Sequence, residues 1–310
     1  MRRAMPIKIP SGLPARKTLE TEGILVIGEK RASRQDIRPL QIAILNLMPE
    51  KIKTETQLAR VLGSSPLQVE MTLIALETHK PKTTPKQHLL DFYRPFSEVQ
   101  ELRFDGLIVT GAPIEKLPFE DVTYWDELKL IFDWTLSHVH SSFYLCWGAQ
   151  AALYHFYDIP KYLLEQKHFG IFDHEVLDHS AMIMHGLNDI IAVPVSRHTE
   201  NRREDFEHIS SLQILINSSE TGICMVMDHE KNHIHMFNHL EYDTHTLAEE
   251  YQRDLAKGEK IAIPANYYNS NDPTQTPVSR WRSSAHLLYG NWLNMIYQST
   301  PYEMDEIGIK

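Results

Sequence analysis

The chain has 310 residues, of which 42% are hydrophobic and 23% charged, and this composition is typical of a globular protein with one large domain or two ordinary ones. Its 41 acidic and 31 basic side chains give a net charge of −10, which argues against a nucleic-acid partner because phosphate binding requires clustered Lys and Arg. No window approaches the roughly 18 apolar residues of a membrane-spanning helix and no signal sequence begins the chain, so we expect a cytoplasmic protein without a membrane partner.

Apolar runs alternate with helical patterns in the first half of the chain. Three prolines and a glycine in residues 5–16 predict an extended arm over the surface rather than a regular element. Short apolar runs predict buried strands, and helical spacing predicts helices between them; the strands are expected at 40–47, 67–74, 104–110 and 142–145, and the helices at 50–62 and 149–156. This alternation indicates a mostly parallel sheet with helices on both faces.

The second half of the chain is richer in strand patterns, which are expected at 190–195, 212–216, 223–227 and 233–237. The sheet is therefore predicted to be mixed. Prolines at 264–280 predict a surface excursion, and an apolar stripe at 283–297 predicts a final helix that packs on the body. The predicted organisation is an N-terminal arm (1–35), an α/β catalytic domain (36–265) and a C-terminal extension packed on the body (266–310).

Two cysteines, Cys146 and Cys224, are too few for a disulfide framework, so both thiols are free to react. Cys146 follows a short apolar strand and precedes a predicted helix. This turn lifts a nucleophile above the sheet edge, and the N–H groups at the helix start favour a thiolate and can hold an oxyanion. The alternative is a buried core thiol, which is the expectation for Cys224 within its strand of Ile, Met and Val.

His239 and Glu241 follow the strand at 233–237, at the carboxyl end where open α/β sheets gather their sites. Two residues apart in extended backbone, they share a face, so the carboxylate can orient an imidazole that takes a proton from a thiol or an alcohol. The alternative is a loop histidine beside a solvated glutamate. Gly111 and Ala112 end another strand and suit the second half of an oxyanion hole, or form an ordinary tight turn.

The segment His229-Glu-Lys-Asn-His233 has the spacing of zinc peptidases. Strand patterns on both sides place residues 228–232 in a hairpin turn, where the two histidines do not share the face that a metal requires. We therefore expect no metal site there. No Gly-rich phosphate loop of the dinucleotide or P-loop type occurs in the sequence either.

Several long motifs in order resemble the homoserine O-acyltransferase family, from Met5 to about Tyr302. They are residues 36–40 (DIRPL), 45–49 (LNLMP), 54–58 (TETQL), 106–113 (GLIVTGAP), 146–150 (CWGAQ), 160–162 (PKY), 239–242 (HLEY) and 281–283 (WRS). The resemblance implies a class I glutamine amidotransferase-like fold with Cys146, His239 and Glu241 as the catalytic set. Tyr144 stands where amidotransferases usually have glycine, which makes glutamine hydrolysis less expected.

The resemblance further implies that Cys146 takes an acyl group from acyl-coenzyme A and that His239, oriented by Glu241, deprotonates the hydroxyl of L-homoserine. The backbone at Trp147, Gly111 and Ala112 would hold the oxyanion. Family substrate-binding positions correspond to Lys167, Ser196 and Arg253; Arg253 can grip an α-carboxylate with two parallel hydrogen bonds, and Ser196 can line the acyl pocket. Each could alternatively be a surface side chain.

Glu115 bears on the acyl donor. In the family a glutamate at this position accompanies acetyl transfer and a glycine succinyl transfer, and a carboxylate there would repel the free carboxylate of a succinyl group. Acetyl-coenzyme A is therefore the expected co-substrate, and no cofactor is expected. The resemblance also implies a homodimeric enzyme of methionine biosynthesis. Glu115 could alternatively be a solvated loop residue that affects neither donor. The alternative functions are succinyl transfer by the same machinery, a cysteine amidase, and a catalytically silent binding module.

Overall fold

The computed structural model describes residues 7–10, 12–22, 26–27, 38–79 and 83–308. In this part of the chain, twelve strands form one sheet. Across the sheet they are β2 (Val26–Ile27), β1 (Ile7–Lys8), β4 (Val69–Ala75), β3 (Leu40–Leu45), β6 (Phe104–Val109), β7 (Val139–Leu145), β12 (His233–Met236), β11 (Gly222–Asp228), β10 (Leu212–Ser218), β8 (Tyr162–Val176) and β9 (Ile190–Glu200), and β5 (Tyr93–Pro95) pairs with β4.

The sheet has a parallel half and an antiparallel half. Every pairing from β2 to β12 is parallel, and every pairing from β12 through β11, β10 and β8 to β9 is antiparallel. The predicted mixed α/β sheet is thus confirmed. Parallel strands need crossover helices, which cover both faces of that half.

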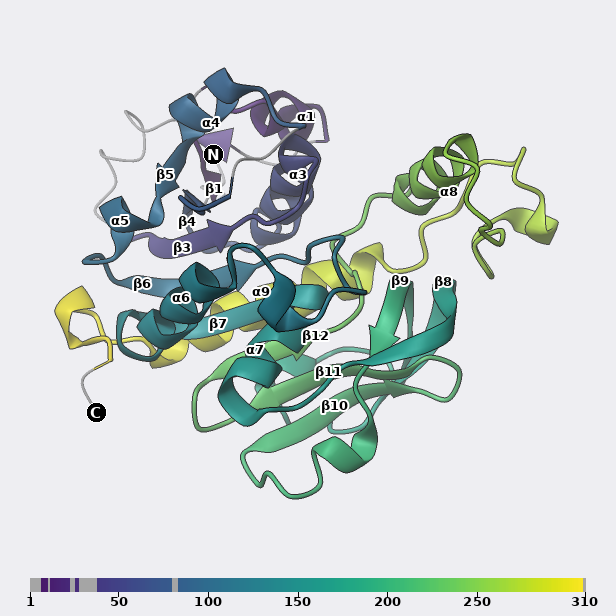
Figure 1. Ribbon diagram of the computed structural model, residues 1–310. Coiled ribbons are helices and arrows are strands. Elements are labelled where there is room, and N and C mark those ends of the chain that lie inside the picture. The colour runs from purple at the N-terminus through teal and green to yellow at the C-terminus, as the bar shows by residue number, and fades with distance from the viewer. Residues whose placement is uncertain (1–6, 11, 23–25, 28–37, 80–82, 309–310) are drawn as a thin grey trace.

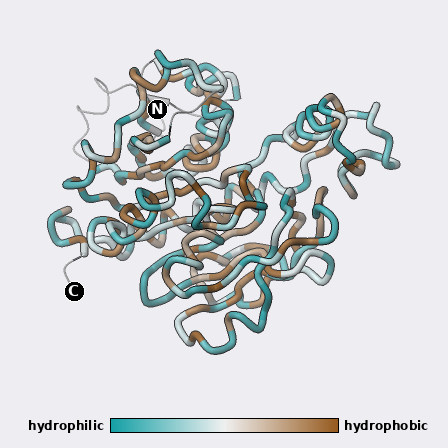
Figure 2. Tube along the Cα trace, viewed as in Figure 1, coloured by the Kyte–Doolittle hydropathy of each residue, from teal (hydrophilic) through white to brown (hydrophobic). Residues whose placement is uncertain are grey.

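Helices pack on both faces of the parallel half (Figure 1). One face carries α1 (Ala15–Thr21), α3 (Lys51–Leu62) and α9 (Arg282–Ser299), and the other carries α6 (Trp125–His138) and α7 (Trp147–Tyr157). Two buried apolar clusters lie between these layers and the sheet, and Figure 2 shows the apolar strands at the centre of the molecule. The smaller elements are α4 (Lys86–Phe92), α5 (Phe96–Val99), η1 (Phe119–Asp121), η2 (Met182–Met184), η3 (Arg203–Asp205), η4 (Asn269–Asn271) and η5 (Met304–Glu306).

The helix α8 (Thr246–Ala256) stands away from the body, above the ends of β8 and β9 (Figure 1). It follows the segment after β12 and precedes the proline-containing excursion expected at 264–280. Because its amphipathic pattern is short, the sequence did not predict it, nor did it predict α6 or the long strand β8. None of the described helices combines the length and apolar character that a membrane crossing requires.

The expectation of an irregular arm over residues 5–16 is wrong for the described part of that segment. Residues 7–8 form β1 within the sheet, and α1 begins at Ala15. Ile9, Leu13 and Leu19 are buried in the core. The burial of these apolar side chains offsets the conformational entropy that the segment loses when it becomes ordered. The proposed division at residues 35 and 265 stays a prediction.

Candidate active site

Three neighbouring parallel strands end at one edge of the sheet, and the residues that follow them carry the expected catalytic groups. β7 lies between β6 and β12, and Leu145 of β7 is in register with Met236 of β12. Gly111, Cys146 and His239 follow the ends of β6, β7 and β12 within a few residues. The strand order therefore brings together groups that lie far apart in the sequence.

Cys146 has an unusual backbone conformation at the turn from β7 into α7. Its φ of 49° and ψ of −120° lie outside the regions that L residues favour. Its N–H donates to the Met236 carbonyl at 2.7 Å, and its carbonyl accepts from Ala149 at 3.0 Å and Gln150 at 3.2 Å. These bonds hold a thiol that is only 7% exposed at the start of α7, where backbone N–H groups favour negative charge.

Two glycines allow the close approach of chain segments at this turn. A Cβ atom added to Gly111 would lie 3.0 Å from the Cβ of Cys146. One added to Gly148 would lie 2.6 Å from the carbonyl oxygen of Thr110, which is closer than real Cβ contacts. The start of α7 and the end of β6 are thus packed as closely as the backbone permits.

His239 and Glu241 form a buried ion pair beside Cys146. Nδ1 of His239 lies 2.6 Å from Oε1 of Glu241, and both side chains are 5% exposed. Burial lowers the pKa of His239, but the Glu241 carboxylate, the charge of Cys146 and hydrogen bonds to both outweigh it and hold the pKa well above 6.5. The geometry joins a thiol, an imidazole and a carboxylate in that order, as nucleophile, base and orienting group require.

Tyr242 is a residue of this centre for which the sequence indicated no role. Its ring stacks on the imidazole of His239, with centroids 4.1 Å apart and planes inclined by 12°. Burial, followed by the charges of Glu250, Glu241, Cys146 and Glu115, raises its pKa well above 10.0. Tyr242 is therefore within electrostatic reach of Glu241 and Cys146 as well as of Glu115 and Glu250.

The expected oxyanion donors lie around the thiol. Trp147 is the first residue of α7, so its N–H has no partner within the helix. Within the described chain, the N–H groups of Gly111 and Ala112 donate to no backbone or side-chain acceptor. All three are thus available to a carbonyl oxygen of a bound substrate. The Trp147 ring itself is fully buried.

A cavity of about 350 Å³ lies between the loop after β6, β8, β9 and α8. Its lining includes Glu115, Lys167 and Arg253. Ser196 donates to Oε1 of Glu250 at 2.8 Å, and Lys167 binds the same carboxylate oxygen. The structure thus brings all the expected substrate-binding side chains to one place.

The charges in this cavity are paired. The guanidinium of Arg253 is half exposed, donates to Asp254 at 2.7 Å and lies 3.6 Å from Glu250. Lys167 also lies 3.8 Å from Asp254 and 4.3 Å from the centroid of the Phe169 ring. Acidic and basic groups side by side suit a ligand that carries both an ammonium and a carboxylate.

Glu115 projects from the loop after β6 into the same cavity. Burial raises its pKa above 4.5, Lys167 and His239 act in the opposite direction, and Glu250 adds to the rise. The side chain is partly buried. It is therefore a pocket residue within electrostatic reach of His239 and not a solvated loop residue.

Cys224 and the segment 229–233 lie in and beside the strand β11. Cys224 is fully buried in β11, and burial raises its pKa to about 12. Residues 229–232 form the turn between the antiparallel strands β11 and β12. His229 bonds Gln213 at 2.7 Å, whereas His233 packs against the Tyr144 ring, so the two histidines point to different neighbours.

Glu250 and Asp254 were not identified from the sequence. They lie on α8 with Arg253, at helical spacing, and face the cavity. A helical reading of residues 246–256 would have placed them beside the expected Arg253. The two acidic residues were missed because the sequence did not predict this helix.

Comparisons with known proteins agree with this geometry. Residues 6–302 match a family model described as homoserine O-succinyltransferase. A protein named homoserine O-acetyltransferase from Hyphomonas neptunium is 56% identical over 304 residues, which cover 98% of this chain and 100% of that protein. Another of that name from Chelativorans sp. is also 56% identical and covers 98% of this chain and 97% of the relative.

Solved structures with a similar fold are far more distant in sequence. A glutamine amidotransferase from Thermotoga maritima superposes with a TM-score of 0.58 at 11% identity and covers 85% of this chain and 100% of that one. A glutamine amidotransferase from Methylobacillus flagellatus gives 0.51 at 12% identity, with 84% and 95% covered. These likenesses confirm the class I glutamine amidotransferase-like fold.

Proposed function

The chain belongs to the homoserine O-succinyltransferase family and is a homoserine acyltransferase that uses an acyl-coenzyme A, and we propose that its acyl donor is acetyl-coenzyme A. Acyl transfer to homoserine is a step of methionine biosynthesis. The observation that carries the catalytic proposal is the buried Cys146, His239 and Glu241 set at one sheet edge.

In the first half-reaction, the thiolate of Cys146 attacks the thioester carbonyl of acetyl-coenzyme A. The coenzyme A thiolate leaves and takes a proton from His239, and the acetyl group stays on Sγ of Cys146. In the second half-reaction, the hydroxyl of homoserine attacks this thioester and gives its proton to His239, and the Cys146 thiolate leaves. The Glu241 carboxylate stabilises the imidazolium in both halves.

The tetrahedral intermediates place negative charge on the former carbonyl oxygen. The N–H groups of Trp147, Gly111 and Ala112 are the proposed donors to this oxygen, supported by the contact of Gly111 with Cys146. Preorganised donors of this kind contribute about 3 kcal/mol each to transition-state stabilisation. No further cofactor is proposed, because thioester exchange needs only a nucleophile, a base and these donors.

We assign the cavity beside Glu115 to homoserine. Arg253 and Lys167 are the proposed partners of its α-carboxylate, and Glu250 is the acceptor available to its ammonium. Ser196, which donates to Glu250, is the proposed contact of the acyl and homoserine groups. Binding would exchange some of the present ion pairs for pairs with the zwitterion.

Acetyl is the proposed donor because a side chain as large as Glu115 occupies the pocket, and its carboxylate would repel that of a succinyl group. The names of the 56% identical relatives support acetyl transfer. Succinyl transfer is the second candidate, favoured by the description of the family model.

The test is a side-by-side assay of acetyl- and succinyl-coenzyme A with L-homoserine. We expect kcat/KM to favour acetyl-coenzyme A, and a preference for succinyl-coenzyme A would contradict the donor. Acetyl-coenzyme A alone should give an acetyl adduct in intact-protein mass spectra. The adduct should be absent from Cys146→Ala and present in the control Cys224→Ala; an adduct that persists in Cys146→Ala would refute the mechanism.

Replacement of Glu115 by glycine should shift the donor preference. Glu115→Gly removes both the bulk and the charge that oppose a succinyl group, so we expect the kcat/KM ratio of acetyl- to succinyl-coenzyme A to fall at least about tenfold. The ratio is measured with homoserine at saturation. Glu101→Gly, at an exposed glutamate outside the cavity, is the control, and an unchanged ratio in Glu115→Gly would rule out this role.

A further inference from the structure

Lys161 contacts the loop that carries Glu115. Its ammonium donates to the carbonyl of Leu117 and lies 4.1 Å from the centroid of the Phe119 ring. The loop of residues 111–118 thus contacts Cys146 at Gly111 and Lys161 at Leu117. No role in the reaction described above falls to this lysine.

Lys161 is itself fixed to the catalytic helix through buried polar groups. Asn201 donates from Nδ2 to the carbonyl of Pro160 at 2.7 Å and accepts from Nε2 of Gln150 at 3.3 Å. Oε1 of Gln150 accepts from Thr199 at 2.8 Å. Gln150 lies on α7, one turn after the nucleophile, so the loop and the nucleophile share one network.

The charge of Lys161 also matters to the loop. Glu115 and Glu120 attract its ammonium, while the larger effect of burial lowers the pKa of Lys161 to about 8. The side chain is therefore a cation at neutral pH, close to two carboxylates of the same segment. A cation that binds a loop carbonyl and attracts Glu115 restrains both the backbone and the charge of that loop.

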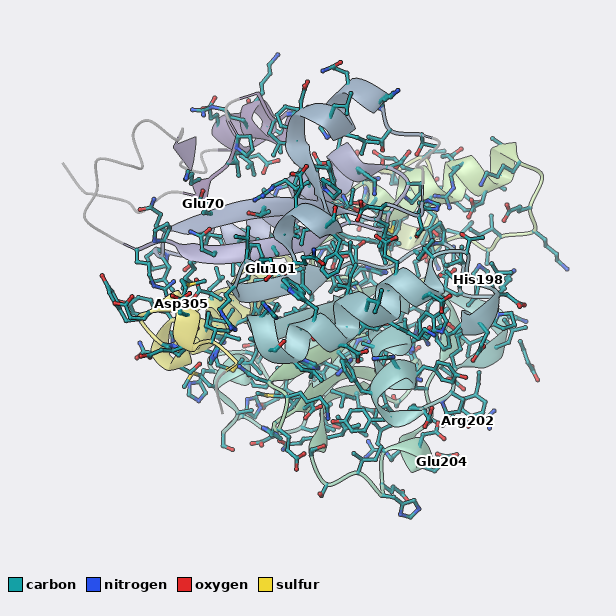
Figure 3. All side chains as sticks on the ribbon, turned by 60° about the vertical axis from the view of Figure 1, so that its left-hand side comes forward. Glu70, Glu101, His198, Arg202, Glu204 and Asp305 are labelled. Atoms are coloured by element: carbon teal, nitrogen blue, oxygen red, sulfur yellow. The ribbon has the colours of Figure 1, made fainter. Side chains whose placement is uncertain are left out.

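We propose that Lys161 is a positioning residue for donor selectivity, which holds the loop of residues 113–118 so that Glu115 stays at the acyl pocket. The proposal rests on the proposed function, because it takes Glu115 as the residue that discriminates between acyl groups. Figure 3 shows the neighbouring β9 residue His198, which also lines the cavity, on the same side of the molecule as Arg202. The loop and β9 thus both line the cavity.

The test compares Lys161→Met, Lys161→Arg and Lys86→Met with the wild type. Methionine retains the packing on Phe119 but loses the charge and the donor, arginine retains both, and Lys86 is an exposed lysine of α4. In Lys161→Met we expect the acetyl-to-succinyl ratio of kcat/KM to fall about tenfold, the scale of one charge-assisted hydrogen bond. The KM for homoserine should stay within about twofold, because the groups proposed to bind it are untouched.

Amide hydrogen exchange of the peptide 111–120 gives a readout that needs no turnover. It should be faster in Lys161→Met and unchanged in Lys161→Arg and Lys86→Met. An equal loss of activity with both donors, or unchanged exchange, would overturn the proposal. If the wild type uses neither donor, the proposed function fails, and the exchange data still decide whether Lys161 holds the loop.

Discussion

The charge of His239 depends on its partners more than on its burial. Burial alone would make the imidazole neutral, yet Glu241 at 2.6 Å and the neighbouring Cys146 keep its pKa well above 6.5. The folded protein therefore holds the His239 proton above the pH at which the unfolded chain releases it. This contribution to stability is complete below about pH 6.5 and is lost as the pH rises through the folded pKa.

We predict that Glu241→Gln weakens this pH dependence. Both proteins compared should carry Cys146→Ser, so that no thiol exchanges the proton with His239. In Cys146→Ser alone, His239 lowers the free energy of unfolding by up to about 1.4 kcal/mol per pH unit above pH 6.5. In Cys146→Ser with Glu241→Gln this slope should be smaller. Urea unfolding at several pH values measures it, and equal slopes would contradict the assigned ion pair.

The same pairing predicts a loss of activity. Glu241→Gln in the otherwise unchanged protein keeps the shape of the side chain but removes the charge that stabilises the imidazolium, so kcat/KM should fall about 10- to 1,000-fold. Steady-state kinetics with homoserine and acetyl-coenzyme A measure this. Glu249→Gln, at an exposed carboxylate on α8, is the control.

Among single residues, those defined by local sequence were predictable and those defined by packing were not. The positions of Cys146 and His239 followed from their places at strand ends. Tyr242 and Glu250 were recognised as site residues only from the structure. The ring of Tyr242 stacks on His239, and the carboxylate of Glu250 binds Lys167 and Ser196. Such contacts have no fixed spacing in the sequence.

At the scale of elements, the turn between β7 and α7 places the proposed nucleophile Cys146 at the start of a helix. The turn needs the unusual φ at Cys146 and a glycine at 148, because α7 begins directly against the end of β6. Position 148 requires glycine because a Cβ atom would collide with the Thr110 carbonyl, and not because the backbone adopts a conformation that only glycine favours.

We predict that Gly148→Ala displaces the start of α7. The added Cβ would lie 2.6 Å from the Thr110 carbonyl, so the variant should lose about 1–3 kcal/mol of stability and most of its activity. Gly290→Ala is the matched control, since nothing lies within 4 Å of its Cβ in the middle of α9. It should gain up to about 1 kcal/mol from helix propensity. Thermal unfolding compares the two, and similar shifts would contradict the packing argument.

The strands and helices with strong apolar patterns were predicted close to their actual bounds, as β3, α3 and α9 illustrate. The helix α8 was missed because its amphipathic pattern is short and contains few apolar residues, and the strand β8 was missed because it is only partly buried. α8 supplies Glu250 and Arg253 to the cavity, so half of the substrate site depends on an element that the sequence did not predict.

At the scale of the whole molecule, an ion pair joins the segment before β3 to β6, and its arginine also binds the C-terminal segment. Arg38 donates to both carboxylate oxygens of Asp105 at 2.9 and 3.0 Å and to the carbonyl of Pro301 at 3.0 Å. Asp105 is fully buried on β6, and its Oδ2 also accepts from the backbone N–H of Gln41 at 2.7 Å.

We predict that Arg38→Met destabilises the protein by about 3–5 kcal/mol, because it leaves the buried Asp105 carboxylate without its cation. Adding Asp105→Asn should recover part of this loss, since an amide oxygen can still accept from Gln41. The control Arg94→Met, at an exposed pair with Glu98, should change stability by less than about 1 kcal/mol. Denaturant unfolding measures all three; strictly additive effects of the Arg38 and Asp105 substitutions would contradict the coupling.

The net charge of −10 takes on a local meaning in the folded protein. An anionic coenzyme A is not drawn by the overall field, so basic groups near the cavity have to meet it. The cavity lining contains Lys116, Lys167 and Lys257 among four carboxylates. The local charge that a substrate meets thus depends on which side chains the fold brings to the cavity, and not on the net charge of the chain.

The sequence by itself determined the α/β alternation, the nucleophile turn at Cys146 and the His239 and Glu241 pair, because each depends on periodicity or on spacing within a few residues. Only the tertiary structure decided that β7 lies between β6 and β12, that Glu115 and Lys167 line one cavity, and that Lys161 donates to the Leu117 carbonyl of the loop that carries Glu115. Strand order and cavity lining join residues that are tens to more than a hundred positions apart. Such contacts are stabilised by packing in three dimensions, and no local pattern records them.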